Sequence, residues 1–305
     1  MVNSKLPKIV VICGPTASGK TSWSLALAKK FKAEIISADS RQIYKEMSIG
    51  TAKETGVWQK AAYVVNEIPH YLIDIIKPDQ IYSTAEFCVQ AKELIQTIIK
   101  KDKIPFIVGG TGLYIDTLVN NFSIPEVKPN LTLRKSLEEK SLAGLQELLK
   151  KLDSETYQTI DLKNKRRISR ALEVVITTGE SFKNKQQKGE KLYETLFIGI
   201  DLPRQILYDR INERIELQIK NGLLKEVEKL VQKYSWDSPA MSGIGYRQFK
   251  DYFAGIISLD QAKEALKQAT RQYAKRQLTW FKRNSEINWC KNLNEAEELV
   301  KNFLK

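Results

Sequence analysis

The feature that most restricts the fold is GPTASGKT at residues 14–21, which directly follows the apolar run KIVVIC. It fits the pattern G-x-x-x-x-G-K-[ST], in which a turn between a strand and a helix points its backbone N–H groups at a phosphate. The lysine would neutralise the terminal phosphate, and the last hydroxyl would bind Mg²⁺. The predicted phosphate site, with Thr21 as its metal ligand, consists of Gly14, Pro15, Thr16, Ala17, Ser18, Gly19, Lys20 and Thr21.

The order of apolar runs predicts an α/β fold with a parallel sheet. Runs typical of buried strands lie at 8–13, 33–40 and 104–110, and stretches with helical periodicity separate them. Strands that alternate with helices at this spacing form a parallel sheet flanked by helices. Together with the phosphate loop after the first strand, this pattern indicates a P-loop NTPase-like core.

The pattern changes near residue 120, which predicts an insertion. Residues 131–182 have helical periodicity and no strand signal, and an apolar strand returns at YETLFIGIDLP. We therefore predict an all-helical insertion domain at 123–190, lodged in an α/β core made of 1–122 and 191–305. The last part of the chain, from about residue 260, is predicted to be helical.

Charge and composition narrow the class of partner. The chain has 49 basic and 36 acidic residues, a net charge of +13, which is typical of a polyanion binder, although a generally lysine-rich proteome gives the same balance. Its single histidine excludes metal sites that need more than one histidine. Three widely spaced cysteines and no long apolar span favour a reducing compartment and no membrane partner. We expect a cytoplasmic monomer.

Two basic runs suggest where a polyanion would bind. KNKRRISRALEV starts at residue 163, and LKQATRQYAKRQLTWFKR covers 266–283, where Arg271, Lys275 and Lys282 are predicted to be free to meet phosphates. A single run of this kind is more often a solvated helix face. Two runs in a chain of this net charge favour nucleic acid.

The phosphate loop alone suggests an ATP-dependent kinase or ATPase, but the expected acidic partner is missing from the next strand end. The run at 104–110 continues into Thr111-Gly112 and carries no carboxylate. The first carboxylate at a strand end is Asp39, and both Asp39 and Thr111 should face the loop. From the residues alone, Asp39 could be a magnesium ligand, a base or a helix N-cap.

Seven segments in a fixed order resemble the tRNA dimethylallyltransferase family, also called tRNA isopentenyltransferases. They are GPTASGKT, ISADSRQIYKEMSIGTAK, PHYLIDI, GGTGLY, NKRRISRALEV, IGYRQ and TRQYAKRQLTWF, and they lie within about residues 8–283. The chain departs from the family at Glu54, where proline is usual, at Tyr71, where histidine is frequent, and in lacking an Asp-Pro before residue 163. The absence of a C-terminal zinc finger points to a bacterial-type member.

The resemblance implies transfer of a dimethylallyl group from dimethylallyl diphosphate to N6 of the adenosine 3′-adjacent to the anticodon in tRNA. The loop would then hold a diphosphate leaving group, with Mg²⁺, rather than the phosphates of ATP. Asp39, Thr111 and Lys20 would be catalytic, and Arg210 and Arg214 would lie near the diphosphate. Contacts with the tRNA anticodon stem-loop would come from Asp39, Thr111, Ser40, Arg41, Gln42, Arg134, Arg166, Arg167, Arg170, Tyr246, Arg247 and Gln248.

Two other activities compete with this hypothesis. A small-molecule kinase would use the same loop but leaves the basic runs unexplained. An adenylate isopentenyltransferase would prenylate a free nucleotide, and we expect such an enzyme to lack the basic insertion and IGYRQ. A non-catalytic RNA-binding module is disfavoured, since it would not need the phosphate loop and Asp39 together.

Overall fold

The structure is a computed structural model that describes residues 6–123, 127, 130–184 and 189–305. The chain forms two compact units. The first consists of Met1–Ile115 and Leu192–Lys305, and the second of Asp116–Lys191. Among the described helices, none is long and apolar enough to cross a membrane.

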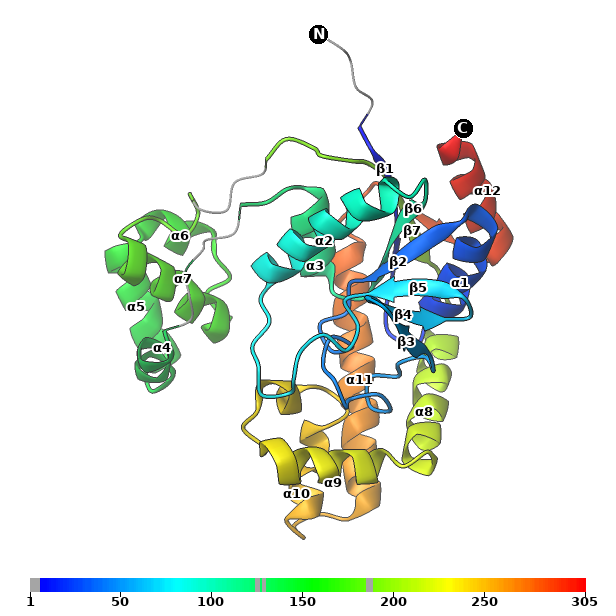
Figure 1. Ribbon diagram of the computed structural model, residues 1–305. Helices are drawn as coiled ribbons and strands as arrows, with labels where there is room; N and C mark the ends of the chain where they lie inside the picture. Colours follow the sequence, from blue (N-terminus) through cyan, green and yellow to red (C-terminus); the bar gives the residue numbers. More distant parts are fainter. Residues whose placement is uncertain (1–5, 124–126, 128–129, 185–188) are drawn as a thin grey trace. The chain divides into compact units, whose positions relative to one another are not determined.

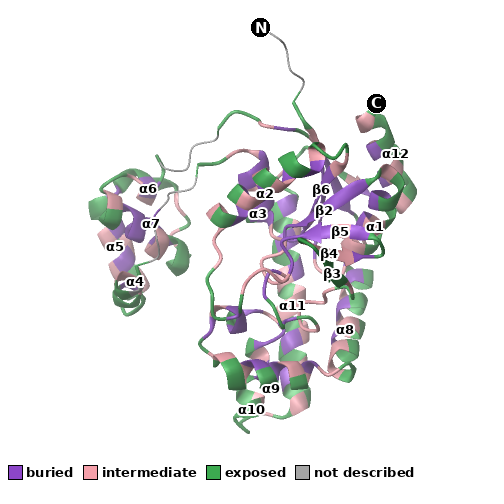
Figure 2. Cartoon of the chain, viewed as in Figure 1, coloured by how far each residue is buried: buried purple, intermediate pink, exposed green. Residues whose placement is uncertain are grey.

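The first unit is built on an eight-stranded sheet whose strand order is β3-β4-β5-β2-β6-β1-β7-β8. Its parallel strands are β1 (Lys8–Cys13), β2 (Ala33–Ser37), β5 (Ile68–Tyr71), β6 (Ile104–Gly109), β7 (Glu194–Ile200) and β8 (Ile287–Cys290). β3 (Val57–Gln59) and β4 (Ala62–Val65) add an antiparallel hairpin at one edge. The predicted parallel α/β core is confirmed, and its central strands are buried (Figure 2).

Four strands lie outside the predicted set. β3, β4 and β5 occupy the stretch between the second and third predicted strands, and β8 interrupts the end of the chain that was predicted to be helical. That last prediction is wrong at residues 287–290, because Ile287 and Cys290 are buried beside β7. The strand has only four residues, too few to show a period.

Helices flank the sheet, and α8, α9, α10 and α11 form a group of helices to one side of it (Figure 1). Leu27 and Ala28 of α1 pack with Ala296 and Val300 of α12 against the strands. A separate apolar cluster joins α8, α9 and α11 to residues 43–47, and α8 runs beside α11. The helices of this unit are α1 (Lys20–Phe31), α2 (Thr84–Ile99), the start of α3 (Gly112–Val119), α8 (Arg204–Lys220), α9 (Leu223–Tyr234), α10 (Lys250–Phe253), α11 (Leu259–Phe281) and α12 (Leu293–Leu304).

Local sequence sets several of these helix ends. The Ser83 hydroxyl accepts a hydrogen bond from the backbone N–H of Glu86, and the Glu86 carboxylate accepts one from the backbone N–H of Ser83. Helix α2 therefore begins with a capping box. Ser258 and Gln261 form the same arrangement at the start of α11. Each box satisfies two of the backbone donors that a helix start leaves without partners.

The described part of the second unit contains helices only. They are α4 (Leu131–Glu138), α5 (Leu142–Leu152), α6 (Ser154–Thr159) and α7 (Lys165–Thr178), preceded by the end of α3. Leu145 and Leu149 of α5 pack against Ile168, Leu172 and Val175 of α7, which gives the unit its own core. The prediction that this part of the chain contacts tRNA stays a prediction.

Candidate active site

The phosphate loop connects the end of β1 to the first residue of α1. Gly14 has φ +141° and Gly19 has φ +98°, conformations that L side chains rarely adopt. The turn therefore depends on glycine at both positions. Lys20 is the first residue of α1, and its Nζ donates to the carbonyl of Pro15 at 2.6 Å. The loop predicted from the sequence is thus preceded by a strand and followed by a helix.

The loop forms one side of a cavity of about 340 Å³. Its other walls come from the turn after β2, the segment at 51–54, the end of β6, and helices α8 and α11. The lining residues are Thr16, Ala17, Gly19, Lys20, Thr21, Ser22, Asp39, Gln42, Thr51, Ala52, Glu54, Gly110, Arg210, Arg214, Tyr273 and Gln277. Both predicted arginines of α8 therefore reach the same cavity as the loop.

Three cations converge on this cavity. Arg214 donates to the Thr16 hydroxyl, and Arg210 Nη1 donates to the carbonyl of Ser18 at 3.4 Å. Burial lowers the pKa of Lys20 to about 8, a shift that Asp39 opposes and Arg214 reinforces. Burial also lowers the pKa of Arg214. Lys20 and Arg214 are thus desolvated, whereas Arg210 is exposed. Three cations gathered around backbone N–H groups make the cavity suited to a compact anion.

Asp39 lines the cavity and orders the turn that follows β2. Its Oδ1 accepts hydrogen bonds from the backbone N–H groups of Arg41, at 2.8 Å, and Gln42, at 3.3 Å. No helix begins here, since the residues after Asp39 form turns. The N-cap alternative is therefore wrong, because the carboxylate holds a turn rather than a helix end. This geometry is compatible with both remaining roles of Asp39, a base or a magnesium ligand.

Thr111 is not among the residues that line the cavity. Its Oγ1 accepts from the backbone N–H of Ser40 at 3.0 Å, and its own N–H donates to Ala38 at 3.1 Å. It thus ties the end of β6 to the turn that presents Asp39. Of the predicted residues 40–42, Gln42 alone is a lining residue.

Two lining residues on α11 were not predicted as site residues. Gln277 is 5% exposed. Its Oε1 accepts from the Thr16 N–H and its Nε2 donates to the carbonyl of Gly110, each at 2.8 Å. Tyr273 lies one turn earlier, and burial raises its pKa to about 12. The available signal is their i, i+4 spacing, which places both on one face of the helix.

Two predictions for the basic and turn segments of the first unit need correction. Tyr246 is 0% exposed and its hydroxyl donates to Glu226 Oε1 at 2.8 Å, so direct contact with tRNA is ruled out in this fold. Arg271 Nη1 donates to Asn212 Oδ1 at 2.8 Å and is not free to meet phosphates. Arg247 is exposed, and its role stays a prediction together with that of Gln248.

In the second unit, two of the four predicted arginines bind an internal carboxylate. Glu173, with a side chain 1% exposed, accepts from Arg134 Nε at 2.9 Å and from Arg170 Nη1 at 2.6 Å. Burial opposes ionisation of Glu173, but hydrogen bonds from the two guanidinium groups leave its pKa below the usual value. Both arginines therefore have a structural role, while their side chains stay 37% and 31% exposed. The prediction that they also contact tRNA stays a prediction. Arg166 and Arg167 are exposed at the start of α7.

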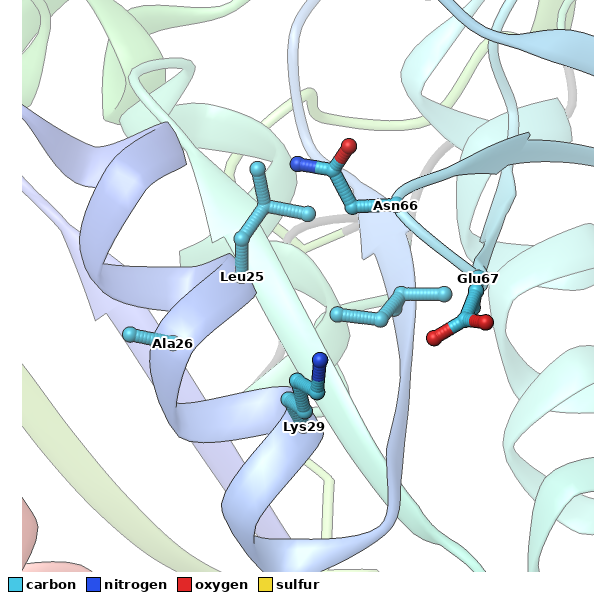
Figure 3. Close-up of a pocket in the computed structure, with 6 residues that line it drawn as sticks. Leu25, Ala26, Lys29, Asn66 and Glu67 are labelled. Atoms are coloured by element: carbon cyan, nitrogen blue, oxygen red, sulfur yellow. The ribbon is translucent and has the colours of Figure 1, made fainter.

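A second cavity, of about 520 Å³, lies between α1 and the turn that joins β4 to β5 (Figure 3). Its lining residues are Leu25, Ala26, Lys29, Asn66, Glu67 and Ile68. It contains none of the predicted site residues and no convergent set of cations. The phosphate-loop cavity is therefore the better candidate for chemistry.

Comparisons with known proteins identify the family. A family model described as IPP transferase matches residues 42–284, and one described as isopentenyl transferase matches residues 7–58. The tRNA dimethylallyltransferase of Thermoanaerobacter sp. (strain X514) is 44% identical over 312 residues, covering 98% of this chain and 96% of the relative.

Solved structures give the same result. A crystal structure of tRNA delta(2)-isopentenylpyrophosphate transferase from Staphylococcus epidermidis has 37% identity and a TM-score of 0.69, with 98% of each chain covered. A eukaryotic dimethylallyltransferase acting on tRNA has 29% identity and a TM-score of 0.76, with 90% of this chain and 70% of that chain covered. The resemblance in the sequence motifs is confirmed: the chain belongs to the IPP transferase family, whose curated relatives are tRNA dimethylallyltransferases.

Proposed function

We propose that this protein transfers a dimethylallyl group from dimethylallyl diphosphate to N6 of the adenosine 3′-adjacent to the anticodon in tRNA. The observation that carries the proposal is the single cavity in which the phosphate loop, three cations and Asp39 meet. Family membership supports the choice of donor and acceptor. A tRNA acceptor argues for activity in the cytoplasm, and we keep the expectation of a monomer.

The donor's diphosphate would bind the phosphate loop. In this reaction the C–O bond of the donor breaks, a C–N bond forms, and both electrons of the broken bond leave with the diphosphate. Lys20, Arg210 and Arg214 line the cavity where that charge would develop. Cations held in a desolvated site stabilise developing charge more strongly than they would in water. Backbone N–H groups of the loop would add to this effect.

The residues present fit a magnesium ion beside the diphosphate. Mg²⁺ prefers oxygen ligands and is often held by one or two protein groups together with substrate phosphates. The hydroxyl of Thr21 lines the cavity and offers such an oxygen. A bound magnesium ion would supply further neutralisation of the leaving group.

Asp39 would accept the proton that N6 loses as the C–N bond forms. An exocyclic adenine amine is a weak nucleophile, so removing its proton in the transition state helps the reaction. The hydrogen bonds from Arg41 and Gln42 orient the carboxylate for this role. The adenine must leave the stack of the anticodon loop to reach the cavity. Arg166 and Arg167 would bind the RNA backbone.

The test is incubation with labelled dimethylallyl diphosphate and either unmodified tRNA or AMP, followed by nucleoside analysis. We expect label on one adenosine of tRNA and none on AMP. Label on AMP alone would support a free-nucleotide acceptor, and transfer of a phosphoryl group from ATP would support a kinase. Lys20→Met, which removes the ammonium but keeps a similar side-chain length, should lose transfer to tRNA.

A further inference from the structure

In residues 48–53, which we call the 48–53 loop, three successive backbone N–H groups donate to one carboxylate. Glu226 is in the first turn of α9. Its Oε2 accepts from the N–H groups of Ser48, at 2.9 Å, and Ile49, at 2.8 Å, and its Oε1 accepts from that of Gly50, at 2.9 Å. Three successive backbone donors on one carboxylate form a charge-assisted set, roughly twice as strong per bond as neutral pairs.

Tyr246 completes this arrangement. Its hydroxyl donates to the same Glu226 oxygen that Gly50 reaches. Its ring lies so close to Gly50 that a Cβ added there would meet ring atoms at 2.5 Å. The motifs SIGTAK and IGYRQ, far apart in sequence, therefore pack as one unit around Glu226. This explains the buried tyrosine, which the proposed tRNA contacts do not use.

The 48–53 loop is also a wall of the active-site cavity. Thr51 lines the cavity, as does Ala52. Gln42, another lining residue, donates through Nε2 to the carbonyls of both, at 3.3 and 3.4 Å. Gln42 in turn follows the Asp39 turn, to which its N–H donates. A displacement of the 48–53 loop would therefore move Gln42 and disturb the turn that presents Asp39 to the acceptor.

The cations of the cavity are attached elsewhere. Lys20 belongs to α1, and Arg210 and Arg214 belong to α8. None of these three donates to the 48–53 loop in any described hydrogen bond. Helix α8 does reach the loop through Gln218, whose Nε2 donates to the carbonyl of Ile49 at 2.6 Å, and that bond does not involve Glu226. The contacts of the three cations therefore do not run through the Glu226 anchor.

We propose that Glu226, supported by Tyr246, is a positioning residue for prenyl transfer, because it fixes the 48–53 loop against which Gln42 and the acceptor base are placed. The proposal rests on the function proposed above. On this proposal, loss of the Glu226 carboxylate lowers the rate of transfer and the order of the 48–53 loop but leaves the affinity for the donor unchanged.

The test compares Glu226→Gln with Glu228→Gln, an identical change at an exposed position on the same helix. The glutamine NH₂ group cannot accept hydrogen bonds, so at least one of the anchored groups loses its partner. Hydrogen exchange of the peptide that covers residues 48–53 should be at least about tenfold faster in Glu226→Gln. The kcat with an anticodon stem-loop should fall about 10- to 100-fold, with the Kd for dimethylallyl diphosphate changed less than about threefold. Glu228→Gln should change none of these.

Unchanged exchange in the 48–53 loop would overturn the proposal, as would faster exchange with full kcat. An equal loss of kcat and of donor affinity would also overturn it, since that result indicates general damage. If Glu226→Gln does not fold, Tyr246→Phe carries the test, because it removes only the hydroxyl and should raise exchange and lower kcat in the same direction. If the wild type transfers no label to tRNA, the proposed function fails, while the exchange data still decide the anchoring of the loop.

Discussion

Affinity for the donor should fall as the pH rises through about 8, because Lys20 loses its proton there. Burial is the main cause of this lowered pKa. Bound diphosphate would favour the ammonium form and hold the pKa of Lys20 near or above its ordinary value. The free protein therefore binds the donor best at a pH below about 8, where the ammonium is already present.

The size of the effect follows from the pKa of about 8. At pH 7 about nine-tenths of the free protein carries the ammonium, and at pH 9 about one-tenth does. The Kd should therefore rise about tenfold from pH 7 to pH 9, which corresponds to about 1.4 kcal/mol. The effect should level off near the pKa of Lys20 in the complex.

The assay is titration of the protein with dimethylallyl diphosphate, without metal, across this pH range. Lys20→Arg is the matched control, because its guanidinium stays charged throughout. The donor's own ionisation acts on both proteins, so the ratio of the two Kd values isolates Lys20. A ratio that does not change between pH 7 and pH 9 would refute the argument. Lys20→Met should bind weakly at every pH and show no such slope.

Three further outcomes are expected. Asp39→Ala should keep tRNA affinity and lower turnover about 10²- to 10⁴-fold in single-turnover assays, and an unchanged rate would remove Asp39 as the base. Neutralising Arg166 and Arg167 together should weaken tRNA binding and flatten the plot of log K against log salt by about 1 to 2, whereas an unchanged slope would mean that both are merely solvated. Glu173→Gln should lower the free energy of unfolding by about 2 kcal/mol in urea titrations, because two partly buried arginines lose their anion. A stability equal to wild type would contradict the structural role of the ion pairs that Glu173 forms with Arg134 and Arg170.

The phosphate loop could be predicted from sequence because its chemistry is local. Gly14, Gly19 and Lys20 act within eight consecutive residues, between a strand and a helix that show their own apolar patterns. Asp39 was within reach for a related reason, since parallel strand ends meet at one edge of a sheet. The three roles left open for Asp39 were reduced to two only by its hydrogen bonds to Arg41 and Gln42.

The rest depended on pairs that are distant in the chain. Gln277 bonds to Thr16 and Gly110, and its i, i+4 spacing from Tyr273 does not reveal either partner. The positive charge of a residue is also a poor guide to RNA contacts, because the sequence does not show whether its anionic partner lies inside the protein or in a bound molecule. The sequence predicts that Arg134 binds RNA, but it does not reveal that Arg134 also binds Glu173, which is set in the apolar segment ALEVV.

Helix α8 connects several of the separate segments that line the active-site cavity. Arg210, Arg214 and Gln218 recur every four residues and so share one face of a single helix. The first two bond to the phosphate loop, and Gln218 Nε2 donates to the carbonyl of Ile49 at 2.6 Å in the 48–53 loop. One rigid helix therefore spans the proposed diphosphate site and the loop that Glu226 anchors. Under the proposed function, this helix links the site of the leaving group to the loop beside the acceptor base.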